Sequence, residues 1–465
     1  MPNLNDKKKK FQFPSSVVML FSIIVIVTLL TWIVPAGQYA YVTDENTGYS
    51  VVDGSSYANV EQSPVGPFRM FIAIQEGFIN GAQIIFLILF GYFWVYSVMQ
   101  TGAFTAMINK LLNSKAKDSK LFVPIVMTIF ALAGSTYGEF ETVYGLIPIF
   151  VALAIALGYD AMVGMCMSGM AVAVGFASAT TNPFTIGIAQ TIAELPMFSG
   201  LGYRWIIFFV FTGTAILLVM RYANKVKKDP TKSLLYGQDY SAFQIERDEN
   251  MEFTTKHKIL MCGMVVTVVC IVYGSLNLGW YINEMSAIFM ISGIISSLVA
   301  GKGPEAIGKD LITSLSEMTV AMVVVGLSRA ILVIMQHGVI IDTVIYGLSS
   351  LMDGLPVWLA AEVMLIIQNF VNFFIPSGSG QATAIMPIMV PLADLQGVGR
   401  QIAVLAYQFG DGFSNLLWPT ASCTIMCGIA KIPLGKWYKF FLPIFGILFL
   451  LQSFFIILAV FIGYQ

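Results

Sequence analysis

Two apolar segments of this chain, each long enough to span a bilayer, are interrupted midway by polar and helix-breaking residues. The first interruption covers residues 175–183 and ends in Asn182-Pro183; the second covers residues 412–420 and contains Pro419. Irregular backbone at membrane depth is tolerated only where protein or a water-filled cavity satisfies its polar groups. Matched interruptions in two halves of a chain indicate the binding site of a secondary transporter.

A Gly- and Ser-rich turn between two apolar arms precedes each interruption. The first pair of arms runs from Leu121 to about Gly158 around a tip at 134–142, and the second from Val357 to Leu395 around a tip at 376–380. An arm of the first pair, roughly 14 to 17 residues long, is short for crossing about 30 Å of hydrocarbon. We therefore predict two re-entrant hairpins, each of which enters and leaves the membrane on one side.

The composition is typical of a polytopic α-helical membrane protein, because 57% of the residues are hydrophobic and 11% are charged, against about 25% charged residues in soluble domains. The net charge of −1 argues against a nucleic-acid partner. With two histidines and no Cys/His cluster, no metal cofactor is expected. No metal-hydrolase or serine-nucleophile motif indicates an enzyme. The expected partners are the lipid bilayer and a small-molecule substrate.

The distribution of Lys and Arg predicts the orientation in the membrane. Lys7 to Lys10 precede the first apolar segment, so the N-terminus is expected in the cytoplasm. The basic loops around 110–120 and 221–258 are expected on the same side, and the loop at 38–75 outside. The chain then divides into a cytoplasmic tail (1–16), a first transmembrane repeat (17–222), a cytoplasmic linker (223–258) and a second transmembrane repeat with an extra helix (259–465).

The second half repeats the first upside down. The helices expected in the first half cover 17–34, 78–99, an interrupted segment at 161–191, and 204–220. Those in the second half cover 259–275, 284–300, 317–339, an interrupted segment at 401–430, and a last helix ending near 463. The predicted fold class is an all-α polytopic membrane protein of two inverted repeats, each with a re-entrant hairpin and a broken transmembrane helix. Such repeats place the binding site at their interface, near the midplane.

The breaks themselves have local chemistry suited to an anion. Asn182 is a helix N-cap followed by Pro183 at the first helical position, where the missing N–H costs nothing. Pro419 is expected to play the same part in the second break, although Trp418 before it is a poor cap. Helix halves that start at mid-membrane present free N–H groups and partial positive charge, which suit a carboxylate. The alternative is that these residues only kink packed helices.

Four ionisable residues lie at membrane depth, where they are costly and therefore functional candidates. Glu139 and Glu141 flank the first hairpin tip, Asp411 precedes the second break, and Arg329 lies in the helix at 317–339. Asp411 could bind a ligand or pair with Arg329, and the two glutamates could instead be solvated. Three acids against one base favour a site that receives a cation: a basic amino acid, a proton or Na⁺.

Uncharged polar residues complete the predicted substrate-binding lining. They are Ser135, Thr136, Thr180, Thr181 and Asn182 in the first half, and Ser377, Ser379, Ser414, Asn415 and Thr420 in the second. Hydroxyl, amide and unwound carbonyl oxygens could hold Na⁺, and the candidates for this are Ser178, Asn182, Ser414 and Asn415. The same groups could equally satisfy loosened backbone.

Several segments resemble the YfcC-type basic amino-acid antiporters. They are residues 13–39, 91–104, 134–142, 179–184 (ATTNPF) and 375–382 (IPSGSGQA), and the similarity covers essentially the whole chain. Those antiporters belong with the arginine/ornithine antiporters and the anaerobic C4-dicarboxylate carriers in the broad ion-transporter superfamily. The resemblance implies a bacterial inner-membrane carrier with two inverted repeats, and a homodimer that moves substrate by an elevator motion.

Three functions remain open at this point. The first is a secondary carrier that moves an amino acid, preferably a basic one, by exchange or by H⁺ or Na⁺ coupling with alternating access. The second is a carrier for C4-dicarboxylates or other small organic anions, with Arg329 and the helix termini as ligands. The third is a channel, which the twofold plan of hairpin and break disfavours.

Overall fold

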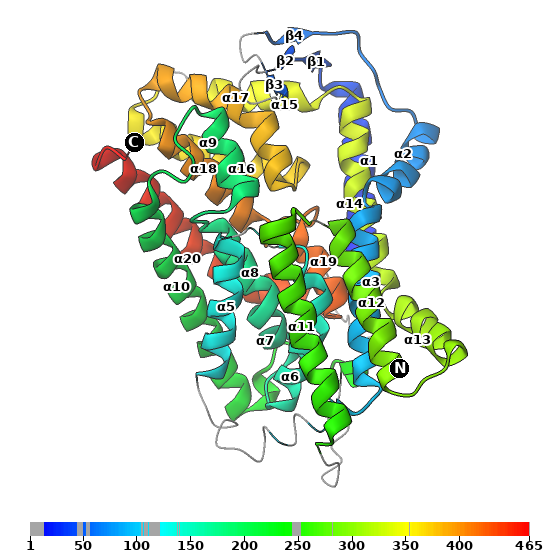
Figure 1. Cartoon of the computed structure of the whole chain (residues 1–465). Coiled ribbons are helices and arrows are strands. Elements are labelled where there is room, and N and C mark those ends of the chain that lie inside the picture. Colours follow the sequence, from blue (N-terminus) through cyan, green and yellow to red (C-terminus); the bar gives the residue numbers. More distant parts are fainter. Residues whose placement is uncertain are drawn as a thin grey trace, which may run out of the picture.

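The computed structural model describes residues 14–43, 50–52, 56–103, 106, 110, 121–136, 138, 140–243, 253–280, 282–352 and 354–464. Helices make up most of this part of the chain (Figure 1). Within these ranges, seven helices are long and apolar enough to cross a membrane. The chain is an all-α polytopic membrane protein of two inverted repeats, each with a re-entrant hairpin and a broken helix, as the sequence predicts.

The first repeat begins with three helices and ends with a long one. In chain order it contains α1 (Ser16–Ile33), α2 (Pro67–Asn80), α3 (Ala82–Met99), the hairpin helices α5 (Phe122–Thr136) and α6 (Val143–Ala156), a broken helix, and α10 (Leu201–Lys228). The first half of the broken helix comprises α7 (Ala161–Met165), a π-helical turn (Cys166–Met170) and α8 (Ala171–Ala177). Its second half comprises a π-helical turn (Pro183–Gly187) and α9 (Ile188–Ile192).

The second repeat follows two short 3-10 turns, Pro230–Lys232 and Ser241–Phe243. It contains α11 (Thr255–Leu278), α12 (Ile282–Val299), α13 (Pro304–Glu317), α14 (Thr319–His337), α15 (Ile341–Ser349) and a 3-10 turn (Ser350–Met352). The hairpin helices α16 (Val357–Phe374) and α17 (Gly378–Gln396), the broken helix α18 (Arg400–Ser414) with α19 (Ser422–Ile429), and α20 (Leu434–Phe461) complete it.

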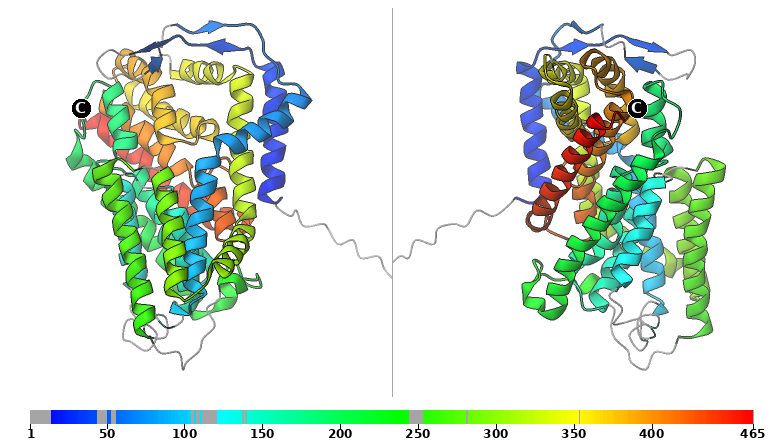
Figure 2. Two further views of the ribbon diagram at one scale, coloured as in Figure 1. Left: turned by 45° about the vertical axis from the view of Figure 1, so that its right-hand side comes forward. Right: turned by 90° about the vertical axis from the view of Figure 1, so that its left-hand side faces the viewer.

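Two small antiparallel sheets lie between α1 and α2. In one, β1 (Gly37–Gln38) pairs with β4 (Ala58–Asn59), and in the other β2 (Tyr41–Thr43) pairs with β3 (Ser50–Val52). They cover one end of the helix bundle (Figure 2). This is the end that the Lys/Arg distribution predicts to be outside.

The two repeats run in opposite directions. α2 and α13 each follow a Gly N-cap, begin with Pro, contain 14 residues and continue after a bend into an apolar helix, α3 or α14. Figure 1 shows α2 towards the end that carries the strands and α13 towards the opposite end. α10 and α20 close the two repeats with 28 residues each.

The packing of the helices is also exchanged between the repeats. α1 and α2 pack on α14, and in the same way α12 and α13 pack on α3. The hairpins and broken helices form a second group, in which α5 packs on α8, α16 packs on α18, and α18 contacts α8. Contacts of α3 with α6 and of α14 with α19 join the two groups. The two broken helices therefore contact each other inside a bundle to which both repeats contribute helices.

Four predicted boundaries are wrong. α2 lies in segments expected to be a loop and the start of the helix at 78–99, and α13 and α15 lie in expected loops. One face of each is polar, so a search for uniformly apolar runs overlooks them. α10 continues to Lys228, inside the segment predicted as linker, because its last turns are basic rather than apolar.

Candidate functional site

The polar end of α5 is fastened to the first break. The Ser135 carbonyl accepts hydrogen bonds from the backbone N–H groups of Thr180 at 2.9 Å and Thr181 at 3.2 Å. The Thr181 hydroxyl donates to the Thr136 carbonyl at 3.1 Å, and the Ser135 and Thr180 hydroxyls lie 3.1 Å apart. These bonds satisfy the backbone that the break releases. Ser178 donates its hydroxyl to the Val174 carbonyl, within its own helix.

The cap predicted at Asn182 is confirmed. Its side-chain oxygen accepts a hydrogen bond from the Phe184 N–H at 2.9 Å, and Pro183 is the first residue of the π-helical turn. The Asn182 side chain is fully buried, and its amide nitrogen has no hydrogen-bond partner among the described residues. One donor is therefore left available at the start of this half-helix.

The second hairpin is fastened to the second break by the same plan, with Asn372 of α16 at its centre. The Asn372 amide donates to the Asp411 carbonyl at 2.9 Å, the Ser414 hydroxyl at 2.7 Å and the Asn415 side-chain oxygen at 3.2 Å. The Thr420 hydroxyl donates to the Phe373 carbonyl at 2.6 Å. In each repeat, the first arm of the hairpin therefore supplies hydrogen-bond partners at or beside the break of the following helix.

The helix start predicted at Pro419 is wrong. α19 begins at Ser422, with Ala421 as N-cap and no side-chain cap. The Cys423 N–H reaches back to the Asn415 carbonyl at 2.9 Å, so the chain makes a wider loop before the helix resumes. The side chain of Trp418 anchors this loop by donating to the Asn369 carbonyl at 2.5 Å.

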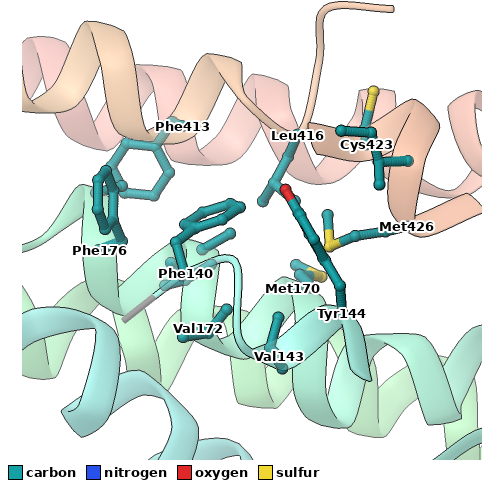
Figure 3. Close-up of a cluster of buried hydrophobic side chains, with 14 of the residues drawn as sticks. Phe140, Val143, Tyr144, Met170, Val172, Phe176, Phe413, Leu416, Cys423 and Met426 are labelled. Atoms are coloured by element: carbon teal, nitrogen blue, oxygen red, sulfur yellow. The ribbon is translucent and has the colours of Figure 1, made fainter. Parts of the chain in front are cut away.

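The two broken helices cross where their first halves end. A Cβ atom on Gly412 would lie 2.2 Å from the Cα of Ala177, so only glycine permits this approach. Gln408 of α18 donates to the Phe176 carbonyl of α8 at 2.6 Å. Figure 3 shows one apolar layer built from both repeats, with Phe140, Tyr144, Met170 and Phe176 on one side and Phe413, Leu416, Cys423 and Met426 on the other. The breaks of both repeats thus belong to one site.

Asp411 is fully buried beside this crossing. Neither carboxylate oxygen meets hydrogen-bond geometry with a described donor, although the Asn415 amide is close by. The tip of the second hairpin covers the carboxylate, because a Cβ on Gly378 would lie 3.3 Å from Asp411 Oδ2 and 2.6 Å from Thr185 Cγ2. Thr185 Oγ1 and Gln408 Oε1 are also buried without described partners. Oxygen atoms of this kind are ligands for a hard cation.

Arg329 faces a different part of the site. It lines a cavity of about 480 Å³ together with Ser377 and Gly380 at the tip of the second hairpin, and with Gln336 and Asp342. Within the described ranges its guanidinium forms no ion pair, so the pairing of Arg329 with Asp411 that the sequence left open does not occur. A charged donor beside a hairpin tip can receive a carboxylate.

The acids of the first hairpin tip are only partly described. Glu141 is partly exposed, and it is close enough to Arg329 and Asp411 for their charges to interact. Glu139 lies outside the described residues. Ser379 lies in the first turn of α17, where its carbonyl accepts a hydrogen bond from the Thr383 hydroxyl. The structure therefore brings Arg329, Glu141 and Asp411 into one electrostatic site.

Sequence reasoning missed the buried amides of this site. Asn372 and Gln408 join hairpin and break as described above, and Gln381 of α17 donates to the Gln368 side-chain oxygen of α16 at 2.7 Å. Burying an amide is costly unless it is hydrogen-bonded. A search for Asn and Gln within apolar segments would therefore have found them.

Hairpins and broken helices that meet between inverted repeats define the class of polytopic membrane transporters. The chain matches the DcuC family, described as C4-dicarboxylate anaerobic carrier, over residues 13–461, and it belongs to that family. The predicted resemblance to the YfcC-type group is confirmed. The chain is 29% identical to the "Putative basic amino acid antiporter YfcC" of Escherichia coli (strain K12), and 28% identical to an uncharacterized protein of Haemophilus influenzae, with 98% of each chain covered in both comparisons.

Two solved structures are also similar. The Alcanivorax borkumensis YdaH transporter gives a TM-score of 0.43 at 14% identity, covering 97% of this chain and 99% of that one. Neisseria gonorrhoeae MtrF, which represents a class of antimetabolite efflux pumps, gives 0.42 at 17% identity, covering 96% and 95%.

Proposed function

We propose that this protein is a secondary active transporter of the bacterial inner membrane, oriented with its N-terminus in the cytoplasm, that carries basic amino acids by alternating access. The observation that carries the proposal is that Arg329 lines the cavity at the second hairpin tip, while Glu141 is close enough to both Arg329 and Asp411 for their charges to interact. A basic amino acid has one carboxylate and two ammonium or guanidinium groups, so it needs partners of both signs.

The roles divide according to position. Arg329, with Ser377 and the N-terminus of α17, receives the substrate carboxylate, because these groups line one cavity. Glu141 receives the cationic end. Asp411, enclosed with Thr185 and Gln408, binds the coupling ion, either H⁺ or Na⁺. A buried carboxylate without a partner is strongly unfavourable, so an ion that binds it could couple occupancy of the site to closure of the hairpin.

A C4-dicarboxylate is the second candidate. The family description and the position of Arg329 favour it. Glu141 and Asp411 favour a basic amino acid as the substrate, because a dianion beside these two carboxylates would need additional cations. A homodimer with an elevator motion is part of the same proposal and rests on the resemblance.

Exchange in proteoliposomes tests the proposal. Vesicles loaded with arginine or ornithine should take up labelled arginine, and lysine should compete while succinate should not. Arg329→Gln should weaken arginine binding at least tenfold, because hydrogen bonds to charged groups contribute about 1.5–3 kcal/mol. Asp411→Asn should remove the dependence on an H⁺ or Na⁺ gradient while leaving the protein folded.

The exposed acid Glu305 of α13 offers a matched control. Glu305→Gln should leave uptake unchanged. Competition by succinate but not by lysine would show that the substrate is a dicarboxylate and not a basic amino acid. Single-channel currents without counterflow would reject a carrier of either kind.

A further inference from the structure

The last turns of α10 carry a basic face. Arg221, Lys225 and Lys228 follow one another at spacings of four and three residues, which keeps neighbours on one side of a helix, and Lys232 joins them from the 3-10 turn that follows α10. With Asn224 they line a hollow of about 310 Å³, and all five are exposed. The acidic side chain beside them is Asp229, which is 3.2 Å from Lys232 and also accepts from Thr231. A net positive charge therefore remains around the hollow.

An apolar stripe continues from this hollow towards the other end of α10. Ile206, Val210 and Leu217 are exposed by 57%, 36% and 66%, and they precede Arg221 on the same face. Gly213 lies between them, and a Cβ there would meet nothing within 4 Å. The distance from Ile206 to Leu217 is about 16 Å at 1.5 Å per residue. This matches one leaflet of a hydrocarbon core that is about 30 Å thick.

We propose that α10 binds an anionic phospholipid in the leaflet predicted to be cytoplasmic. The basic hollow holds the phosphate headgroup, with Arg221 at the edge of the apolar region, where its guanidinium can bind a phosphate through two hydrogen bonds. One acyl chain lies along the stripe and fills the gap at Gly213. The combination of positive charge and an apolar track of leaflet depth selects a lipid over a soluble anion, which would use only the hollow.

The position of α10 makes such a lipid relevant to transport. α10 lies at the outer edge of the helix bundle in Figures 1 and 2, so the stripe is accessible from the bilayer. On its other side, α10 packs against α5 and α8, the first arm of the hairpin and the first half of the broken helix. The bound lipid is therefore one helix away from the first break.

Native mass spectrometry of the detergent-solubilised chain tests the proposal with phosphatidylglycerol and phosphatidylcholine as probes. Replacing Arg221, Lys225, Lys228 and Lys232 by Gln should lower the affinity for phosphatidylglycerol at least tenfold, because each basic side chain near an anionic surface contributes about fivefold. Binding of phosphatidylcholine should not change. The matched control replaces Lys258, Lys309, Lys436 and Lys439 by Gln, which removes the same charge from the same membrane side outside the hollow.

A second variant separates the lipid from a soluble anion. Gly213→Leu should fill the gap in the stripe without a clash. It should lower the affinity for phosphatidylglycerol and leave the binding of glycerol phosphate unchanged. The proposal is wrong if the control variant loses as much affinity for phosphatidylglycerol as the variant that lacks the four basic residues of the hollow. It is equally wrong if inorganic phosphate displaces the lipid completely at millimolar concentration, or if Gly213→Leu has no effect on lipid binding.

Discussion

Replacing Gly412 by Ala tests whether close contact of the two broken helices holds the site together. The new Cβ would lie 2.2 Å from the Cα of Ala177, 2.5 Å from its Cβ and 2.9 Å from its N. Carbon atoms normally approach to about 3.5–4.0 Å. Two of these neighbours are backbone atoms, which cannot rotate away, so α8 and α18 must separate.

Two opposing effects set the size of the change. Overpacking a tight core costs about 1–3 kcal/mol, and Ala in place of Gly gains up to about 1 kcal/mol in helix propensity. Because the contact is with backbone, we expect the free energy of unfolding to fall by about 2 kcal/mol. Uptake should fall as well, since the crossing positions Asp411. Ala177→Gly should rescue only part of the loss, because the Cα and N atoms of residue 177 remain.

Thermal unfolding in detergent, followed by tryptophan fluorescence, measures the effect. Gly446 in α20 is a matched control, because a Cβ there would meet nothing within 4 Å. Gly446→Ala should therefore raise the midpoint while Gly412→Ala lowers it. A midpoint for Gly412→Ala at or above that of the unmodified protein would refute the reasoning that this contact is obligatory.

Two further substitutions test how the breaks and the linker are held. Asn372→Leu should lower the free energy of unfolding by about 2–4 kcal/mol, because it removes the two N–H donors of a buried amide and leaves their acceptors unsatisfied at roughly 1–2 kcal/mol each. Denaturation in mixed micelles measures this change, and an unchanged midpoint would contradict it. Asp160→Ala removes an N-cap of α7 and the acceptor for Tyr222 and Ser233, each at 2.5 Å. The loss should be about 1–2 kcal/mol for the cap alone, and trypsin cleavage after Lys232 should become faster; cleavage at the unmodified rate would show that Asp160 does not anchor the linker.

The membrane spans, both hairpins and both breaks could be predicted because they depend on local sequence. Long apolar runs and Gly, Ser or Pro at their centres act within a few residues. The cap at Asn182 is of this kind, since its partner is the Phe184 N–H two residues away. Local chemistry sufficed wherever the partner was close in the chain.

The remaining features depend on partners far along the chain. The start of α19 follows from the Trp418 anchor on Asn369, 49 residues earlier. The partners of Asn372 lie about 40 residues away, so a local pattern can point to the buried amide but not to the groups that it bonds. α2 and α13 were missed because burial of a single face is decided by the neighbouring helix. Contacts between residues far apart in the chain therefore determine the helix boundaries and hydrogen bonds that sequence periodicity does not indicate.

The two repeats share a plan of hydrogen bonds but not of charge. Residues 178–182 of the first break contain no ionisable side chain, and hydroxyls and backbone suffice to fasten that break to its hairpin. Asn372 fastens the second break through the carbonyl, not the carboxylate, of Asp411. The Asp411 carboxylate is thus not needed to close the fold, yet its burial opposes folding. Among the described residues no donor meets hydrogen-bond geometry with the Asp411 carboxylate, which is why we propose the second break as the site of the coupling ion.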